Sequence, residues 1–148
     1  MTKKKTTGNS FEKLQADHVE RVKELAAINR TTQIIKENKT IEETLDKICN
    51  ILPEAWQYPD HTVARIIHDK HEYKSRGFKQ SRWIQREPFT TIDNKKGASE
   101  VYYTSEFRDF DEGPFLKEER HLIENIASLV TGYLNSITAR YILTRQKD

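Results

Sequence analysis

Cysteine and glycine are scarce in this sequence. Cys49 is the only cysteine among 148 residues, which excludes an internal disulfide and any metal site built from several cysteines. It lies in a helical pattern between Ile48 and Ile51, so we expect a buried and unreactive thiol. Only five glycines occur, and none belongs to a glycine-rich phosphate-binding loop.

Long apolar runs and an excess of one charge are missing as well. No stretch approaches the ~20 apolar residues of a membrane span, and no apolar segment follows the N-terminal lysines as in a signal peptide. Lys and Arg total 25 against 23 Asp and Glu, which gives no case for binding nucleic acid or an anionic membrane. We therefore expect a cytoplasmic protein without nucleic-acid or membrane partners.

The length and composition indicate one domain with a modest core. Apolar residues make up 35% of the chain and charged residues 32%, against roughly 45–50% apolar in typical globular domains. A core of this kind gains from oligomerisation. We expect a disordered tail at 1–10, a helix for signalling and dimerisation at 11–37, and a folded domain at 38–145 that includes a long C-terminal helix.

That C-terminal helix is the strongest pattern in the chain. Gly113-Pro114 interrupts the preceding segment, and the helix is predicted to begin near Phe115. One apolar stripe starts at Ile123 and repeats every three or four residues. A second stripe needs another partner, and the simplest is the same helix of a second chain. This second stripe consists of Leu122, Leu129 and Leu143.

The first helix shows a narrower, heptad-like apolar stripe. Ser10 can cap a helix that runs on through Ile35. Polar residues interrupt the seams, so the helix is a weak coiled coil by itself but a suitable one beside a second helix. An ordinary amphipathic helix lying on its own domain is the equal alternative. The residues expected at a dimer interface here are Leu14, Val22, Leu25, Ile28 and Ile35.

The middle of the chain reads as β-structure. Residues 62–68 are rich in β-branched side chains, and further strands are predicted at 72–78, 82–92 and 98–105. Pro88 cannot donate to a ladder, so it places a bulge or a sheet edge in the third strand. Two helices, consecutive antiparallel strands and a last helix make an α+β fold.

Segments at both ends of this plan are similar to GAF domains, small sensory modules of bacterial signalling proteins. The segments Leu25-Ala26-Ala27-Ile28-Asn29 and Thr40-Ile41-Glu42-Glu43-Thr44-Leu45 resemble the opening helices of the family, and Phe115-Leu116-Lys117-Glu118-Glu119-Arg120 resembles the start of its closing helix. Three further segments resemble a subgroup that precedes signalling or phosphoenolpyruvate-synthase-like output modules: Leu52-Pro53-Glu54-Ala55-Trp56-Gln57-Tyr58-Pro59, Ala64-Arg65-Ile66 and Glu112-Gly113-Pro114-Phe115.

The resemblance implies an antiparallel sheet of about four to six strands with the N- and C-terminal helices packed on one face. In the family these helices form a dimeric bundle, and a small molecule often binds on the opposite face. The cyclic-nucleotide signature of the family is absent here, and no loop cysteine is present to hold a tetrapyrrole. We therefore expect no cofactor.

Aromatic and cationic residues are the candidates for a small-molecule site, because aromatic walls with one or two cations suit such pockets. The favoured alternative is that the aromatics form the sheet core and that the arginines are surface residues or partners for Glu100 and Glu87 across strands. The candidate residues are Trp56, Tyr58, Arg65, Arg82, Trp83, Tyr102 and Tyr103. Three nearby histidines, His61, His68 and His71, match no closed zinc spacing, so no metal site is predicted.

These patterns favour a non-enzymatic sensory or regulatory domain that resembles GAF domains. It would form a homodimer through its terminal helices, bind a small molecule or a partner, and act on an output domain or signalling protein. One alternative is a dimerisation scaffold that binds no ligand. A small-molecule enzyme is the third hypothesis, and it would need an acid/base constellation in a deep pocket.

Overall fold

The computed structural model describes the backbone of residues 2–147, and the side chains in that range except those of 2–11, 13, 16, 17, 146 and 147. Helices lie at both ends of the described chain and strands in its middle. The elements are α1 (Thr2–Lys36), α2 (Ile41–Ile51), the 3-10 turns η1 (Leu52–Ala55) and η2 (Pro59–His61), β1 (Thr62–His68), β2 (His71–Lys74), β3 (Trp83–Thr90), β4 (Lys96–Tyr103) and α3 (Lys117–Lys147).

The four strands form one antiparallel sheet in the order β2-β1-β4-β3. This confirms the α+β class and the antiparallel sheet predicted from the sequence. β3 is an edge strand, which explains how Pro88 is tolerated there, since an edge residue needs no ladder partner on its outer side. Register brings Arg65 of β1, Glu100 of β4 and Arg86 of β3 into line across the sheet.

Local sequence explains where several elements begin and end. Thr40 caps α2 as predicted, because its side-chain oxygen accepts a hydrogen bond from the Glu43 N–H (3.1 Å). Asp69 adopts a positive φ of 57° in the turn from β1 to β2, a conformation that Asp tolerates better than most residues. Gly97 in β4 allows close packing, because a Cβ there would collide with the Ile67 carbonyl and the Phe89 ring.

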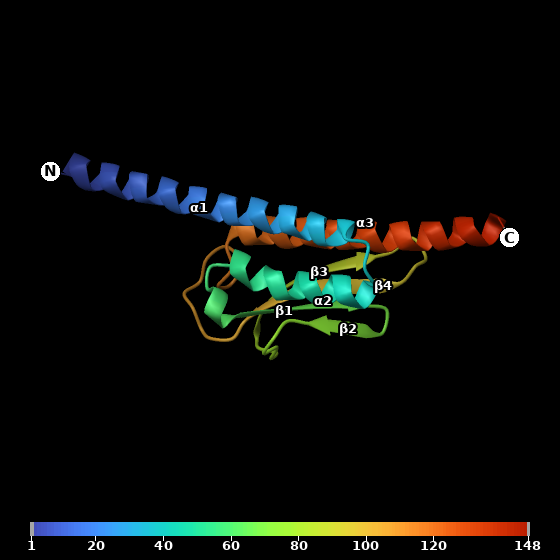
Figure 1. Ribbon diagram of the computed structural model, residues 1–148. Helices are drawn as coiled ribbons and strands as arrows, with labels where there is room; N and C mark the ends of the chain where they lie inside the picture. Colours follow the sequence, from blue (N-terminus) through green and yellow to red (C-terminus); the bar gives the residue numbers. More distant parts are fainter. Residues whose placement is uncertain (1, 148) are drawn as a thin grey trace.

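The helices form two layers on one face of the sheet (Figure 1). α2 packs on β1 and β2, and α3 packs on β3 and β4. α1 lies outside them and packs on α3, α2 and η1. The sequence prediction placed both terminal helices directly on the sheet, and α1 differs because α2 and α3 already cover that face.

The start of α1 also differs from the prediction. The helix begins at Thr2, so residues 2–10 are helical rather than a disordered tail, and Met1 lies outside the described residues. Gly8 is the poorest helix former in this stretch, and a single glycine costs only about 1 kcal/mol relative to alanine. Within 2–147, no helix combines the length and apolar character that crossing a bilayer requires.

Candidate functional site

The two terminal helices run side by side in the same direction but are offset along their axes (Figure 1). Glu20 of α1 lies near Glu118 in the first turn of α3. Burial raises the pKa of the Glu20 carboxyl, and the negative charge of Glu118 raises it further, whereas Lys23 lowers it. At the other end, Arg140 Nη1 of α3 donates to Asn38 Oδ1 just after α1 (3.5 Å). The N-terminal part of α1 therefore extends beyond the start of α3. At the opposite end of the molecule, the C-terminal part of α3 extends beyond the end of α1.

Both helices expose apolar side chains on these extensions: Leu14 in α1 is 68% exposed, and Leu143 near the end of α3 is 58% exposed. Val22 (53% exposed) and Leu25 (60%) lie further along α1, where it overlaps α3. Because isolated chains rarely leave several large apolar residues of one helix pair in water, this surface is a candidate interface.

The other residues expected at an interface have different surroundings. Ile28 and Ile35 are half-buried and pack against the core of their own chain, and Leu129 is half-buried. Leu122 is 1% exposed and belongs to the core, so it is not presented to a second chain. Its side chain turns inward because α3 packs on the sheet along this turn.

The ligand-site candidates on the helix side of the sheet act as packing residues. Trp56 is fully buried, and its indole N–H donates to Gln85 Oε1 (3.1 Å). Tyr103 stacks on Phe115, with ring centroids 4.5 Å apart. Tyr58 stacks on Phe107 at 3.7 Å. These rings form a continuous cluster from the core to the loop before α3.

Glu119 is a buried carboxylate that the sequence patterns did not single out as a site residue. It is 1% exposed, and its carboxylate accepts hydrogen bonds from Leu116 N–H (2.8 Å), Gln57 N–H (2.8 Å), Gln57 Nε2 (3.2 Å) and Tyr103 Oη (2.9 Å). Burial raises its pKa, against the lowering effect of these hydrogen bonds. The side chain joins the η1–η2 segment, β4 and the first turn of α3, which is a structural role.

Two further candidates, Arg65 and Tyr102, lie on the sheet face opposite the helices. Arg65 Nε donates to Glu100 Oε1 (2.7 Å), its Nη1 to Glu72 Oε1 (2.8 Å), and its Nη2 to Tyr102 Oη (3.1 Å). Phe78 covers this cluster, with its ring 5.2 Å from the Arg65 guanidinium carbon and 5.5 Å from the Tyr102 ring. The chain thus fills this face with its own side chains.

The last two candidates, Arg82 and Trp83, stack on each other 4.8 Å apart at the start of β3. Trp83 is also the register partner of Tyr103 in β4 and packs against the core, so the candidates occupy both faces of the sheet. Five grooves on the described surface, of about 150–600 Å³, are lined by other residues. The structure does not bring the seven together into one pocket.

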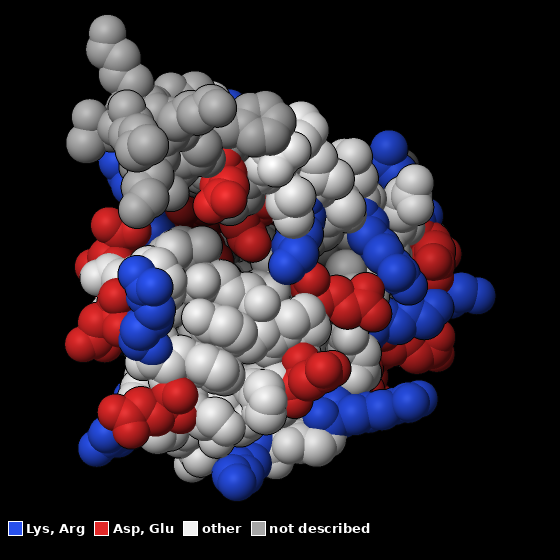
Figure 2. All heavy atoms as spheres, turned by 90° about the vertical axis from the view of Figure 1, so that its left-hand side faces the viewer, with Lys and Arg blue, Asp and Glu red and all other residues white. Residues whose placement is uncertain are grey.

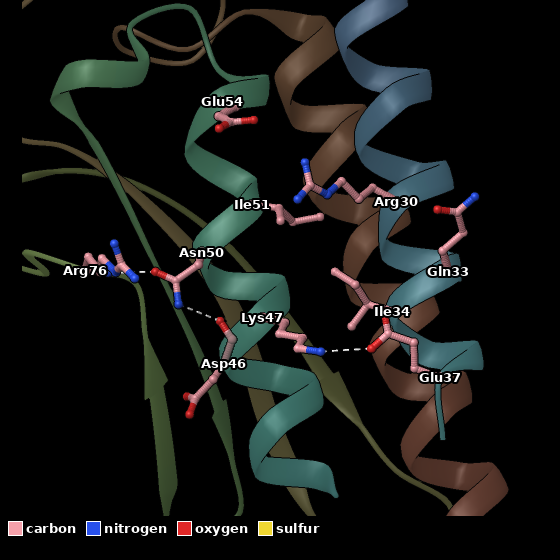
Figure 3. A pocket seen from close by; sticks show the side chains of 10 residues that line it. All are labelled: Arg30, Gln33, Ile34, Glu37, Asp46, Lys47, Asn50, Ile51, Glu54 and Arg76. Carbon is pink, nitrogen blue, oxygen red and sulfur yellow. Dashed lines mark hydrogen bonds and ion pairs between the residues drawn. The ribbon is translucent and has the colours of Figure 1, made fainter. Parts of the chain in front are cut away.

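A groove between α1 and α2, which the sequence did not indicate, has a volume of about 530 Å³ (Figure 3). Ile34 and Ile51 give it an apolar floor, and Arg30 extends from α1 across Ile51. An ion pair between Lys47 Nζ and Glu37 Oε2 (2.9 Å) joins the two helices beside it. Residues from distant parts of the chain form this groove, and therefore no sequence spacing could reveal it.

The end of the molecule beneath the N-terminal extension is a mixed surface. Figure 2 shows an uncharged area there with acidic and basic side chains around it. In the loop before α3, the ring of Phe107 is half-buried, and Phe110 is exposed with the Arg108 guanidinium 4.9 Å from its ring.

In comparisons with known proteins, no protein-family model and no curated protein matches this chain. The fold itself defines the class, an α+β domain with a four-stranded antiparallel sheet and a pair of long helices.

Proposed function

We propose that this chain is a non-enzymatic, dimeric regulatory domain similar to GAF domains. Its terminal helices would form the dimer and carry a conformational change to an output domain or partner protein. The observation that carries the proposal is the offset, parallel pair of α1 and α3, with exposed apolar residues on both extensions (Figure 1).

The energetics support association through this surface. Full burial of a leucine or valine side chain stabilises by about 1.5–3 kcal/mol. Each of these residues occurs once in each chain of a dimer, so Leu14, Val22 and Leu25 supply six side chains that association can bury. That gain is of the size of the roughly 4–15 kcal/mol lost in translational and rotational freedom on association.

The mechanism is a shift between two packings of the helices. In a parallel dimer, α1 and α3 of both chains form a four-helix bundle over their overlap and two-stranded segments at the ends. A ligand or partner that prefers one packing changes the angle or register of these ends. A neighbouring domain then responds to the changed helix ends.

A dimerisation scaffold without a ligand is the second candidate. It is favoured by one observation: Arg65, Glu100, Tyr102 and Phe78 fill the sheet face that holds ligands in the proteins this chain resembles. Native mass spectrometry of protein purified from cells separates the two, since a retained small molecule adds a discrete mass to the dimer.

Leu25→Lys tests the interface directly. A lysine at this exposed position leaves the core intact but puts a charge into the dimer, so we expect a monomer in light scattering after size-exclusion chromatography. Ile92→Lys is the matched control, because Ile92 is also 60% exposed but lies in a β-turn, and this variant should remain dimeric. A wild-type monomer, or a Leu25→Lys dimer of wild-type affinity, contradicts the proposal.

A further inference from the structure

The groove between α1 and α2 has the size and the mixed lining of a small-ligand site. Its volume of about 530 Å³ falls within the range of about 300–1,000 Å³ usual for such sites. Figure 3 shows α1 on one side of it and α2 with η1 on the other, with Ile34 and Ile51 between them. A molecule held here touches both helices at once.

Most polar groups around the floor already have partners. Lys47 is paired with Glu37 (2.9 Å). Asn50 Oδ1 accepts from the Arg76 N–H, and Asn50 Nδ2 donates to the Asp46 carbonyl, both at 2.9 Å. Arg30 and Arg76 differ, because no ion pair within 4.0 Å joins either guanidinium to a carboxylate of the described side chains. Arg76 lies on the far side of Asn50 (Figure 3), so Arg30 is the cation beside Ile51. Its guanidinium reaches over the apolar floor.

The acidic residues of the groove limit the charge of a ligand. Glu54 lines the end next to η1, and Asp46 lines the α2 side. One negative group can pair with the two parallel N–H donors of Arg30. Arg76 lies beyond Asn50 (Figure 3), so a second negative charge close to the first would meet Glu54 and Asp46 and be repelled.

We infer that this groove binds a small amphipathic monocarboxylate. The carboxylate pairs with the guanidinium of Arg30, and a short apolar chain lies on Ile34 and Ile51. The regulatory consequence rests on the proposed function: a ligand that bridges α1 and α2 favours the packing in which α1 stays on the domain, and thereby biases the helix pair. Binding itself does not depend on dimer formation.

Hexanoate is the probe for this site. Isothermal titration calorimetry measures its affinity, and methyl NMR locates it, with shifts expected at Ile34 and Ile51. Hexylamine has a similar tail with the opposite charge, and butanedioate carries a second carboxylate; we expect both to bind at least about tenfold more weakly.

Arg30→Met is the decisive variant, because it keeps an apolar stem and removes the cation. We expect the affinity for hexanoate to fall about tenfold to a hundredfold, as for a lost hydrogen bond between charged groups. Arg82→Met, at an exposed arginine outside the groove, should bind as the wild type does.

Two results overturn the inference: hexanoate that leaves the Ile34 and Ile51 methyls unshifted, or equal affinity of Arg30→Met and wild type. Shifts confined to Ile67 and Ile84, on the opposite sheet face, would be an instance of the first. A monomer that still shows the Ile34 and Ile51 shifts contradicts only the proposed dimer.

Discussion

At the scale of single residues, buried polar groups connect the parts of the molecule. Arg65 is 9% exposed and Glu100 4%, so their ion pair is largely removed from water. The sequence alternative that the arginines are surface residues or cross-strand partners of Glu100 and Glu87 is met at Glu100, which pairs with Arg65 of the neighbouring strand. Glu87 instead pairs with Arg120 of α3 (2.9 Å), which no strand pattern indicates.

Cys49 illustrates a residue whose character the sequence did reveal. It is fully buried, and its thiol donates to the Tyr73 carbonyl (3.2 Å). Burial raises its pKa to about 12, so the reactive thiolate is suppressed near neutral pH. The expectation of a buried, unreactive cysteine agrees with this environment.

Glu119 gives a pH-dependent prediction. Its pKa in the folded protein is raised above the ordinary value of 4.5, so the native state holds this proton more tightly than the unfolded chain does. Its stabilising contribution is therefore complete below pH 4.5 and decreases as pH rises through the raised pKa. Urea unfolding at several pH values above 4.5 should show this decline in wild type and a smaller one in Glu119→Gln.

Glu119→Gln should also lower stability at a fixed pH. The amide presents one acceptor oxygen where the carboxylate presents two, so some of the four donors around it lose their partner, at about 1–3 kcal/mol each. Glu118→Gln, one residue earlier in α3, is the control and should unfold like wild type. Equal unfolding curves for the two variants would contradict the structural role of Glu119.

At the scale of elements, local signals and packing decide different properties. β1 spans the predicted residues 62–68, whereas β2 ends at Lys74 rather than near Phe78 as the pattern suggested. The reason is tertiary: residues 75–82 leave the sheet edge, and Phe78 folds back over Arg65 and Tyr102. The sequence could not show this, because an aromatic residue is equally suited to a strand and to a covering loop.

The cap of α2 gives a prediction at this scale. Thr40→Ala removes the side-chain oxygen that accepts from the Glu43 N–H, so unfolding should become easier by about 1 kcal/mol. Thermal or urea denaturation followed by circular dichroism measures the difference. Lys39→Ala, at the preceding exposed position, is the control. An effect of Thr40→Ala no larger than that of Lys39→Ala would show that the cap contributes nothing.

At the scale of the whole molecule, the helix pair dominates the shape. α1 and α3 overlap along the domain and extend from its opposite ends (Figure 1). The dimer that we propose would cover their exposed apolar residues, in keeping with the modest share of apolar residues in the chain.

Association predicts a thermal midpoint that depends on protein concentration. Mass action stabilises a dimer as concentration rises, because only the folded chain associates. The thermal midpoint of wild type should therefore rise when the protein concentration is increased a hundredfold, and so should that of Ile92→Lys. The midpoint of Leu25→Lys should stay constant. A wild-type midpoint independent of concentration would argue for a folded monomer.

The sequence by itself determined the fold class, the four strands, the cap of α2 and the two long helices, because these follow from periodicity and local turn chemistry. It also indicated exposed interface candidates such as Leu14 and Leu25. Only the tertiary structure decided that α1 lies outside α2 and α3, that Leu122 points into the core, and that the ligand-site candidates occupy both faces of the sheet. It alone revealed Glu119 and the α1–α2 groove. Helical periodicity shows that one face of a helix is apolar, but the packing of distant segments decides which surface covers that face.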